Sequence, residues 1–199
     1  MQENQRTVLM LAALTHDFGK AISTFEKIRN GQNRIVSPGH EHAGVSLGED
    51  FLGRIDAPLA IKERVLPLIA NHMAHFDSIT DRAIRRLARK VAPESIESLV
   101  LVMMADAFGR PPRPAVVPEG VLAIAAKARD LAVHEKPPEQ ILKGRHLIEQ
   151  GCLPGPEMGD LLKEAYEAQL AGDFDDLNGA LKWWREHSGD LQKSDNNQG

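Results

Sequence analysis

The stretch TVLMLAALTHDFGK, Thr7 to Lys20, carries the strongest structural signal in this chain. Its TVLMLAALT part is apolar at helical spacing, so we expect a helix from about Arg6 to Asp17. The helix ends in His16 and Asp17, which present an imidazole nitrogen and a carboxylate oxygen side by side. Because divalent transition metals, Mn²⁺ and Mg²⁺ accept ligands of these types, the stretch predicts a metal site at a helix end.

The composition is that of an ordinary globular protein. Of the 199 residues, 42% are hydrophobic and 26% are charged, and the formal net charge of −4 gives no overall attraction to nucleic acid. The single cysteine, Cys152, excludes an intramolecular disulfide and a multi-cysteine zinc site. No apolar run approaches the roughly 20 residues that span a bilayer, and the N-terminal MQENQR does not resemble a signal peptide. We therefore expect a cytoplasmic protein with no membrane partner.

The remaining sequence predicts helices as well. Strand-like alternation of useful length is absent and aromatic residues make up only 5% of the chain, so we expect an all-α protein. The helices that we expect begin near His40, Pro58, Thr80, Pro93 and Val121, and three short ones follow Ile141. The segment SIESLVLVMMADAF, which ends at Phe108, is apolar almost all round and should be the central buried helix.

A proline-rich segment divides the chain. GRPPRPAVVP, Gly109 to Pro118, holds four prolines in ten residues and cannot be helical. We therefore predict a main helical domain over 1–116, a C-terminal helical subdomain over 117–190 and a polar, frayed tail over 191–199.

Three further side chains could complete a metal site with His16 and Asp17. His40 opens a helix in PGHEHAG, His72 closes one in IANHMAHF, and Asp106 interrupts the apolar helix in MMADAFG. An aspartate among apolar neighbours is costly to bury unless it is paired or bound to a cation. Ligands from helix ends and from one central helix can converge inside a helical bundle.

Each of these side chains also has a simpler interpretation. A lone histidine beside an apolar face is more often a hydrogen-bonded residue than a ligand, and His42 or His75 could take the place of its neighbour. Asp106 could be a buried carboxylate that accepts hydrogen bonds near a helix end. The order of the candidate ligands on separate segments favours the metal site.

At these residues the chain resembles the HD superfamily of metal-dependent phosphohydrolases. More narrowly, it resembles the C-terminal HD region of bacterial tRNA nucleotidyltransferases, the CCA-adding enzymes and their poly(A) polymerase relatives. LAALTHDFGK followed by PGHEHAG is similar to the HD and GHxxxG region of that family. GRHLIEQGCLPGPEMGDLLKEAYEAQLAGDF, Gly144 to Phe174, is similar to the helical segment that closes such proteins. The resemblance implies an HD-domain helical bundle with a small C-terminal helical subdomain.

The resemblance also implies which residues hold the metal. His16, Asp17 and Asp106 would bind a first divalent ion, which could be Mn, Ni, Mg or Fe. Asp17 would bridge to a second ion that is held by His40 and His72.

The catalytic roles implied by the resemblance belong to Asp17 and Lys20. Lys20 would contact a substrate phosphate as a point charge. The metal would polarise a phosphoryl oxygen and lower the pKa of a bound water. The substrate would be a phosphoester of a nucleotide or of an RNA end, with tRNA as a candidate partner.

The chain departs from the family in two respects. No strand with paired carboxylates is expected, so the chain should not add nucleotides itself. The histidine that the family carries upstream of HD has no counterpart, because none of the fifteen residues before His16 is a histidine. We therefore expect either a fragment of a longer protein or an altered site with weaker metal binding.

The segment DRAIRRLARK carries basic residues on one face of a predicted helix. They are Arg82, Arg85, Arg86, Arg89 and Lys90. Such a run is usually the solvated face of an amphipathic helix. The alternative is a surface that binds RNA phosphates by neutralising their charge, which Arg110 and Arg113 could extend.

Two functions of different classes follow from these patterns. The first is an HD-domain phosphohydrolase, which the retained ligand types favour. The second is a non-catalytic helical module that binds RNA or a partner chain and keeps a vestigial metal site, which the missing upstream histidine favours. A purely structural bundle would leave Asp106 without a partner.

Overall fold

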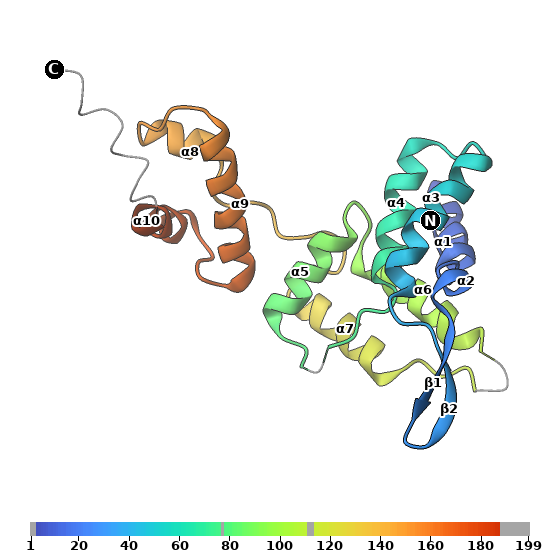
Figure 1. Ribbon diagram of the computed structural model, residues 1–199. Coiled ribbons are helices and arrows are strands. Elements are labelled where there is room, and N and C mark those ends of the chain that lie inside the picture. The colour runs from blue at the N-terminus through green and yellow to red at the C-terminus, as the bar shows by residue number, and fades with distance from the viewer. Residues whose placement is uncertain (1–2, 77, 111–113, 188–199) are drawn as a thin grey trace. The chain divides into compact units, whose positions relative to one another are not determined.

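The computed structural model describes residues 3–76, 78–110 and 114–187. The chain divides into two compact units, 1–137 and 138–199. Both units are built mainly from helices, which confirms the expected all-α class (Figure 1). Among the described helices, none has both the length and the apolar character that a bilayer span requires.

The first unit contains seven described helices and one β-hairpin. The elements in chain order are α1 (Glu3–Thr15), α2 (Lys20–Ser23), β1 (Phe25–Arg29), β2 (Gln32–Val36), α3 (His40–Arg54), α4 (Leu59–Asn71), α5 (Asp81–Val91), α6 (Ile96–Phe108) and α7 (Glu119–Asp130). Helix α6 packs against α1, α4, α5 and α7, as expected for the central helix.

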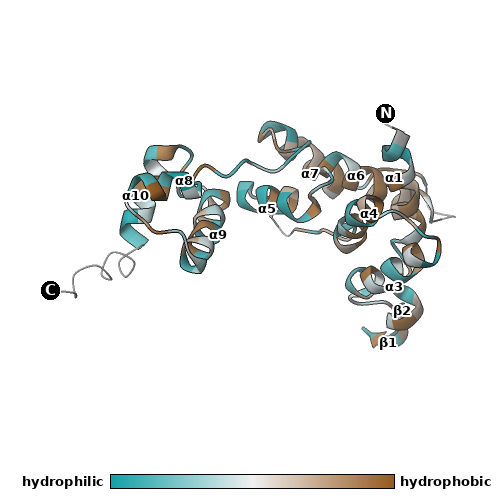
Figure 2. Cartoon of the chain, turned by 90° about the horizontal axis from the view of Figure 1, so that it is seen from above, coloured by the Kyte–Doolittle hydropathy of each residue, from teal (hydrophilic) through white to brown (hydrophobic). Residues whose placement is uncertain are grey.

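The core of the first unit forms where these helices meet. Leu68 and Ile69 of α4, Ile84 of α5 and Leu99 of α6 are fully buried. Figure 2 shows hydrophobic residues gathered around α1, α4 and α6. Each buried aliphatic side chain of this kind contributes about 1.5–3 kcal/mol to folding. This packing holds the ends of α1, α4 and α6, which carry the candidate ligands, in one place.

A second buried cluster in the first unit is polar and centres on Glu94, in the turn before α6. The Glu94 carboxylate accepts hydrogen bonds from Arg64 Nε at 2.5 Å and from Gln5 Nε2 at 3.0 Å. Gln5 also accepts from Arg64 and donates to Ser98 Oγ at 2.9 Å. The Glu94 network therefore connects α1, α4 and α6. Burial works to raise the pKa of Glu94, but the hydrogen bonds from Ser98, Gln5 and Arg64 hold it below its usual range.

The hairpin is an addition to the helices that we expected. Asn30 and Gly31 both have positive φ angles, 53° and 72°, as a two-residue type I′ turn requires. The strands pair antiparallel from Phe25 with Val36 to Arg29 with Gln32. All five residues of β1 are exposed, so the strand shows no alternation of buried and exposed positions. For this reason the strands were not recognisable in the sequence.

The division between the units differs from our prediction. We expected it after residue 116, whereas the structure places it after Pro137. Helix α7 belongs to the first unit, because its Val121, Ile124 and Ala128 are buried in the same core as α5 and α6. The proline-rich segment is thus a connection within a unit. The predicted tail, 191–199, lies outside the described residues.

The second unit contains α8 (Gly144–Glu149), α9 (Pro156–Ala171) and α10 (Leu177–His187). Its core includes Leu147 and Trp184, which are almost completely buried. The buried side chain of Gln169 binds the backbone of the segment before α8. Its Oε1 atom accepts from the Ile141 N–H at 3.0 Å, and its Nε2 atom donates to the Glu139 carbonyl at 2.8 Å. This unit is a small helical body with its own core, as the predicted C-terminal subdomain should be.

Candidate metal centre

The five predicted metal ligands lie together in the first unit. His16 and Asp17 follow the last residue of α1, and His40 is the first residue of α3. His72 is the C-cap of α4, and Asp106 lies in the last turn of α6. Residues that are up to ninety positions apart in the chain therefore meet at the ends of four packed elements.

His16 stands between two carboxylates. Its Nε2 atom is 3.3 Å from Asp17 Oδ2 and 3.3 Å from Asp106 Oδ1. On the other side of Asp17, the Oδ1 atom lies 3.3 Å from His40 Nε2 and 4.0 Å from His72 Nε2. Asp17 thus directs one oxygen to each of two groups of possible ligands.

The three imidazole rings are held by the same kind of backbone contact. Each Nδ1 atom lies 2.7–2.8 Å from the carbonyl oxygen three residues earlier in the chain, which can only accept a hydrogen bond. Each neutral ring therefore carries its proton on Nδ1 and presents the Nε2 lone pair to the site. His40 Nε2 and His72 Nε2 face each other at 3.2 Å. Two facing lone pairs require a shared proton or a cation.

The donor atoms fit a divalent cation. Asp17 Oδ1 is buried and has no hydrogen-bond partner within the described residues. Donors from His16, Asp17 and His72 lie within 4.8 Å of one another. Imidazole and carboxylate ligands suit a divalent transition metal, whose ligands lie about 2.0–2.2 Å away. A cation at this position would satisfy both the unpartnered oxygen and the facing imidazoles.

The surroundings shift the pKa values of the cluster residues in different directions. Burial lowers the pKa of His72, and the neighbouring imidazoles lower it further, so the ring is held neutral. Burial also lowers the pKa of His16, but the hydrogen bond to Asp106 and the charge of Asp17 raise it overall. Despite burial, the hydrogen bond that His16 donates when its ring is protonated and the ion pair with Arg110 lower the pKa of Asp106 to about 2, so Asp106 is ionised at neutral pH.

Gly19 allows the HD segment to approach α3 closely. A Cβ atom built on Gly19 would lie 1.9 Å from the His40 carbonyl oxygen and 2.6 Å from the Gly44 nitrogen. No side chain can be accommodated at such distances, so the glycine in HDFGK serves to bring Asp17 next to His40. Gly48, one turn after Gly44 in α3, lies close to α4, since a Cβ built on it would lie 2.7 Å from Ile69 Cδ1, at the end of a side chain that can move.

Two basic side chains contact the carboxylates of the cluster. Lys20 Nζ lies 2.6 Å from Asp17 Oδ2 at the start of α2, where its ammonium group is partly exposed. Arg110 forms a two-pronged ion pair with Asp106, in which Nε donates to Oδ1 at 3.0 Å. The sequence analysis missed this role of Arg110, because it lies in the proline-rich segment and showed only its charge.

His42 and His75 do not replace their neighbours. The His42 side chain is 81% exposed, and its ring faces Glu41 Oε1 at 3.0 Å. His75 is also exposed, whereas His40 and His72 are buried. The structure therefore gathers the more buried histidine of each predicted pair into the cluster.

The predicted basic face lies on α5, which carries none of the candidate ligands. Arg82, Arg89 and Lys90 are exposed. Arg85 Nη2 lies 3.8 Å from Asp81 Oδ2, and Lys127 Nζ lies 2.6 Å from Asp81 Oδ1. The Asp81 carboxylate therefore neutralises part of the positive charge on this face. Arg86 and Lys90 line a cavity of about 400 Å³ that extends to Glu41 and Asn71, next to His40 and His72 in the chain. Arg113 lies outside the described residues.

Comparison with known proteins gives results that agree with this geometry. The HD domain family model matches residues 1–110. The chain is 28% identical over 170 residues to the A-adding tRNA nucleotidyltransferase of Deinococcus radiodurans, which covers 83% of this chain and 38% of that protein. No solved structure gives a significant match.

Two further relatives have similar names. The CC-adding tRNA nucleotidyltransferase of Thermus thermophilus is 26% identical over 179 residues, 88% of this chain and 39% of that protein. The multifunctional CCA protein of Xanthomonas euvesicatoria is 29% identical over 167 residues, 80% of this chain and 37% of that protein. The chain thus spans less than two fifths of the length of the relatives that it matches.

Proposed function

The chain belongs to the HD domain family, and we propose that its cluster of histidines and aspartates is a divalent metal centre that hydrolyses a phosphoester of a nucleotide or of an RNA end. The observation that carries this proposal is Asp17 Oδ1, which is buried, has no hydrogen-bond partner in the described part of the chain and faces the imidazoles of His40 and His72. A carboxylate oxygen in such a position is costly unless a cation binds it.

The residues of the chain have separable tasks in this reaction. A bound divalent metal would polarise a phosphoryl oxygen and supply hydroxide from water near neutral pH. The backbone carbonyls at Ala13, Ser37 and Ile69 keep the three Nε2 lone pairs directed at the centre. Lys20, on the exposed side of Asp17, offers an ammonium group to a substrate phosphate.

The relatives support RNA as the class of substrate or partner. Two of them are named as tRNA nucleotidyltransferases, and we propose a tRNA or another RNA end as the partner, in the cytoplasm. The strands of the described residues form only a two-stranded exposed hairpin, which offers no sheet to carry a nucleotidyltransferase centre. We therefore propose that this chain does not add nucleotides by itself.

The test measures metal content and turnover on the same protein. Purified protein is analysed for bound metal, and hydrolysis of bis(p-nitrophenyl) phosphate is followed with added Mn²⁺, Ni²⁺, Mg²⁺ or Fe²⁺. We expect Asp17→Ala to lose both metal and turnover, and the exposed control Asp130→Ala on α7 to keep both. If metal content does not respond to Asp17→Ala, the assignment of the site is wrong.

A second candidate function is RNA binding through the basic face of α5. The exposed positions of Arg82, Arg89 and Lys90 on one helix favour it. The double variant Arg82→Glu/Lys90→Glu should weaken RNA binding and flatten its dependence on salt concentration. Lys163→Glu/Lys182→Glu, in the second unit, makes the same change in net charge and serves as the control. Equal effects of the two variants would reject the α5 surface.

A further inference from the structure

The β-hairpin of the first unit carries none of the candidate ligands. It extends away from the helices in Figure 1. Every residue of β1 is exposed, and so is every residue of β2 except Val36. The hairpin therefore adds little to the core, and its side chains are accessible to another molecule.

The register of the strands gives the hairpin two different faces. In an antiparallel pair, directly opposed residues share a face, and successive residues alternate between the faces. Lys27 lies opposite Arg34, and Arg29 is two residues further along β1, so these three cations form one surface, the basic hairpin face. The other face carries Ile28 and Ile35, which are 75% and 74% exposed.

The charge of the basic hairpin face is not balanced by the described carboxylates. Within residues 3–76, 78–110 and 114–187, no carboxylate forms an ion pair with Lys27, Arg29 or Arg34. Glu26, the acidic residue of the hairpin, lies on the other face and accepts a hydrogen bond from Asn33 at 2.6 Å. Like charges directly opposite each other destabilise a strand pair, and an anion bound across them would remove that cost.

The base of the hairpin is joined to the metal centre on both sides. Thr24 Oγ1 and Ser37 Oγ lie 2.7 Å apart beside the ends of the strands, and the Ser37 carbonyl lies 2.8 Å from His40 Nδ1. Before β1, Lys20 lies 2.6 Å from Asp17. The hairpin therefore rises from the two segments that carry His40 and Asp17.

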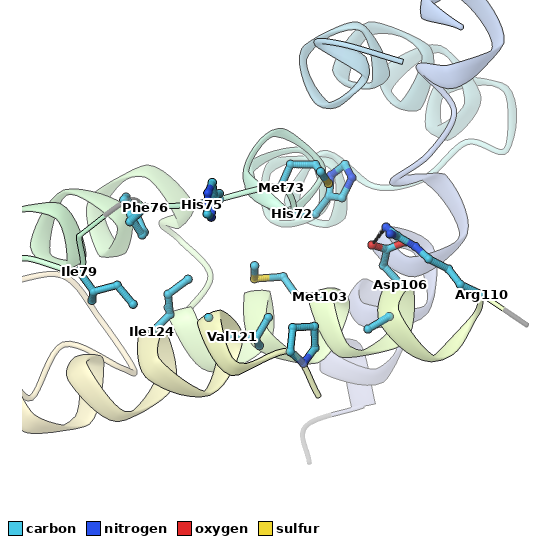
Figure 3. Close-up of a pocket in the computed structure, with 14 residues that line it drawn as sticks. His72, Met73, His75, Phe76, Ile79, Met103, Asp106, Arg110, Val121 and Ile124 are labelled. Atoms are coloured by element: carbon cyan, nitrogen blue, oxygen red, sulfur yellow. Dashed lines mark hydrogen bonds and ion pairs between the residues drawn. The ribbon is translucent and has the colours of Figure 1, made fainter. Parts of the chain in front are cut away.

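The cavity beside the metal centre offers less positive charge than the hairpin. It has a volume of about 420 Å³ and is lined in part by His72 and Asp106 of the cluster (Figure 3). Among the described residues that line it, Arg110 is the only lysine or arginine, and it is paired with Asp106. A chain of several phosphates would find no unpaired cation along the cavity.

We propose that the basic hairpin face binds the phosphate backbone of a single-stranded RNA segment, next to the end that lies at the metal centre. The proposal rests on the proposed function in placing the RNA end there. Lys27 and Arg29 project from Cα atoms about 7 Å apart, close to the spacing of successive phosphates along an extended strand. Phe25, which is 50% exposed, shares this face and offers a ring on which a base can stack.

The first experiment measures affinity for an eight-nucleotide RNA at several salt concentrations, on the full chain. The variant is Lys27→Thr/Arg29→Thr/Arg34→Thr, because threonine favours strands. We expect at least tenfold weaker binding at low salt, with metal content unchanged. The slope of log affinity against log salt should become about 2 units shallower, since each phosphate contact on a single strand contributes about 0.7. Unchanged affinity or slope would overturn the proposal.

Two control variants separate the three cations from the hairpin and from net charge. Ile28→Thr/Ile35→Thr changes the other face of the same strands. Arg54→Ala/Arg129→Ala/Lys136→Ala removes the same charge from exposed positions elsewhere in the first unit. Both controls should bind RNA within twofold of the unmodified protein. A loss in either control equal to that in the triple hairpin variant would overturn the assignment.

RNA length tests the connection to the metal centre. A five-residue strand spans about 17 Å, so a dinucleotide with its end at the metal centre does not reach Arg29, the last residue of β1. The unmodified protein and the triple hairpin variant should bind a dinucleotide within twofold of each other, and the difference should grow with length. A difference independent of length would overturn the connection.

A last comparison concerns the class of partner and the proposed function. Polyglutamate of matched charge should compete with the RNA only weakly, and equal competition would assign the face to an acidic protein instead. If no phosphoester is hydrolysed but the triple hairpin variant still loses RNA binding, the proposed function fails and the RNA surface stands. If hydrolysis occurs and the variant binds RNA as before, the surface fails and the function stands.

Discussion

The Glu94 network and the cluster around Asp17 both bury carboxylates in the first unit, but only one of them is complete. Both Glu94 oxygens accept hydrogen bonds, from Arg64 and Gln5. Asp17 has Lys20 on one oxygen, and its other oxygen is buried without a partner among the described residues. Buried polar groups are normally satisfied, so this unsatisfied oxygen, which faces the His40 and His72 imidazoles, supports the proposed cation site.

The comparison distinguishes a structural role from a binding role. The Glu94 network joins three helices with protein atoms alone, and nothing needs to be added to it. The hydrogen bonding of the Asp17 cluster is incomplete, because His40 Nε2 and His72 Nε2 face each other at 3.2 Å and Asp17 Oδ1 has no hydrogen-bond partner among the described residues. Substitutions in the Glu94 network should therefore affect the stability of the fold, and substitutions in the Asp17 cluster should affect metal binding.

The largest expected effect is the response of stability to metal. A ligand that binds only the folded state at 1,000 times its dissociation constant adds about 4 kcal/mol to the free energy of unfolding. We expect Mn²⁺ or another divalent ion to raise the melting temperature accordingly, and Asp17→Asn to remove the rise. In chelator, Asp17→Asn should unfold no earlier than the unmodified protein. A metal-dependent rise that persists in Asp17→Asn would contradict the comparison.

The next largest effect should come from breaking the complete network. Glu94→Ala leaves the half-buried Arg64 without its carboxylate, so we expect a loss of about 3 kcal/mol in the free energy of unfolding, measured in urea. Glu94→Gln, which keeps a carbonyl oxygen for Arg64, should lose less. Metal affinity, measured at a temperature where the variants are folded, should not change. A tenfold weaker affinity would show that the two clusters are coupled.

Gly19→Ala should affect folding and binding together, by smaller amounts. The added Cβ would meet the His40 carbonyl, so the HD segment and α3 must move apart. We expect a loss of about 2 kcal/mol in stability, as for other overpacked sites, with a weaker affinity for metal. The control is Gly120→Ala, where a Cβ meets nothing within 4 Å. If Gly19→Ala changed stability but not metal affinity, the close approach would not determine the position of Asp17.

The smallest effect concerns pH. Folding lowers the pKa of Glu94 from its usual 4.5, so the carboxylate stabilises the protein above that pH. The contribution is lost as the pH falls through the folded-state pKa. Melting temperatures recorded from pH 7 to pH 3 in chelator should fall less steeply for Glu94→Gln than for the unmodified protein. Parallel curves would mean that Glu94 does not contribute to the loss of stability in acid.

The sequence made the candidate ligands recognisable because their contexts were unusual. A histidine and an aspartate ended an apolar helix, and Asp106 interrupted the most apolar helix of the chain. Glu94 gave no such signal, because PES before a helix is also what an exposed, capped helix start looks like. The importance of Glu94 depends on Arg64 and Gln5, and only the tertiary structure brings these residues to it.

The fold was predictable to a similar degree and for similar reasons. Helices with a buried face were predicted, because a buried face makes apolar residues recur at helical spacing in the sequence. Helix α7 showed that period as well, but a proline-rich segment before it suggested a domain boundary that the packing of Val121 and Ile124 overrides. The exposed hairpin left no such period, so its strands were not predicted.

The contact between Gly19 and the start of α3 also bears on how this chain can vary in length. The segment 20–39 begins and ends at this contact, so it forms a closed loop that contains the hairpin. For a flexible loop with joined ends, doubling the length costs only about 0.6 kcal/mol. Insertions and deletions between the strands should therefore be tolerated, whereas one residue inserted between His16 and Gly19 would separate Asp17 from His40. Chains with the same cluster of candidate ligands can thus differ in length between the two strands, whereas Lys20 and the Ser37 carbonyl must keep their positions.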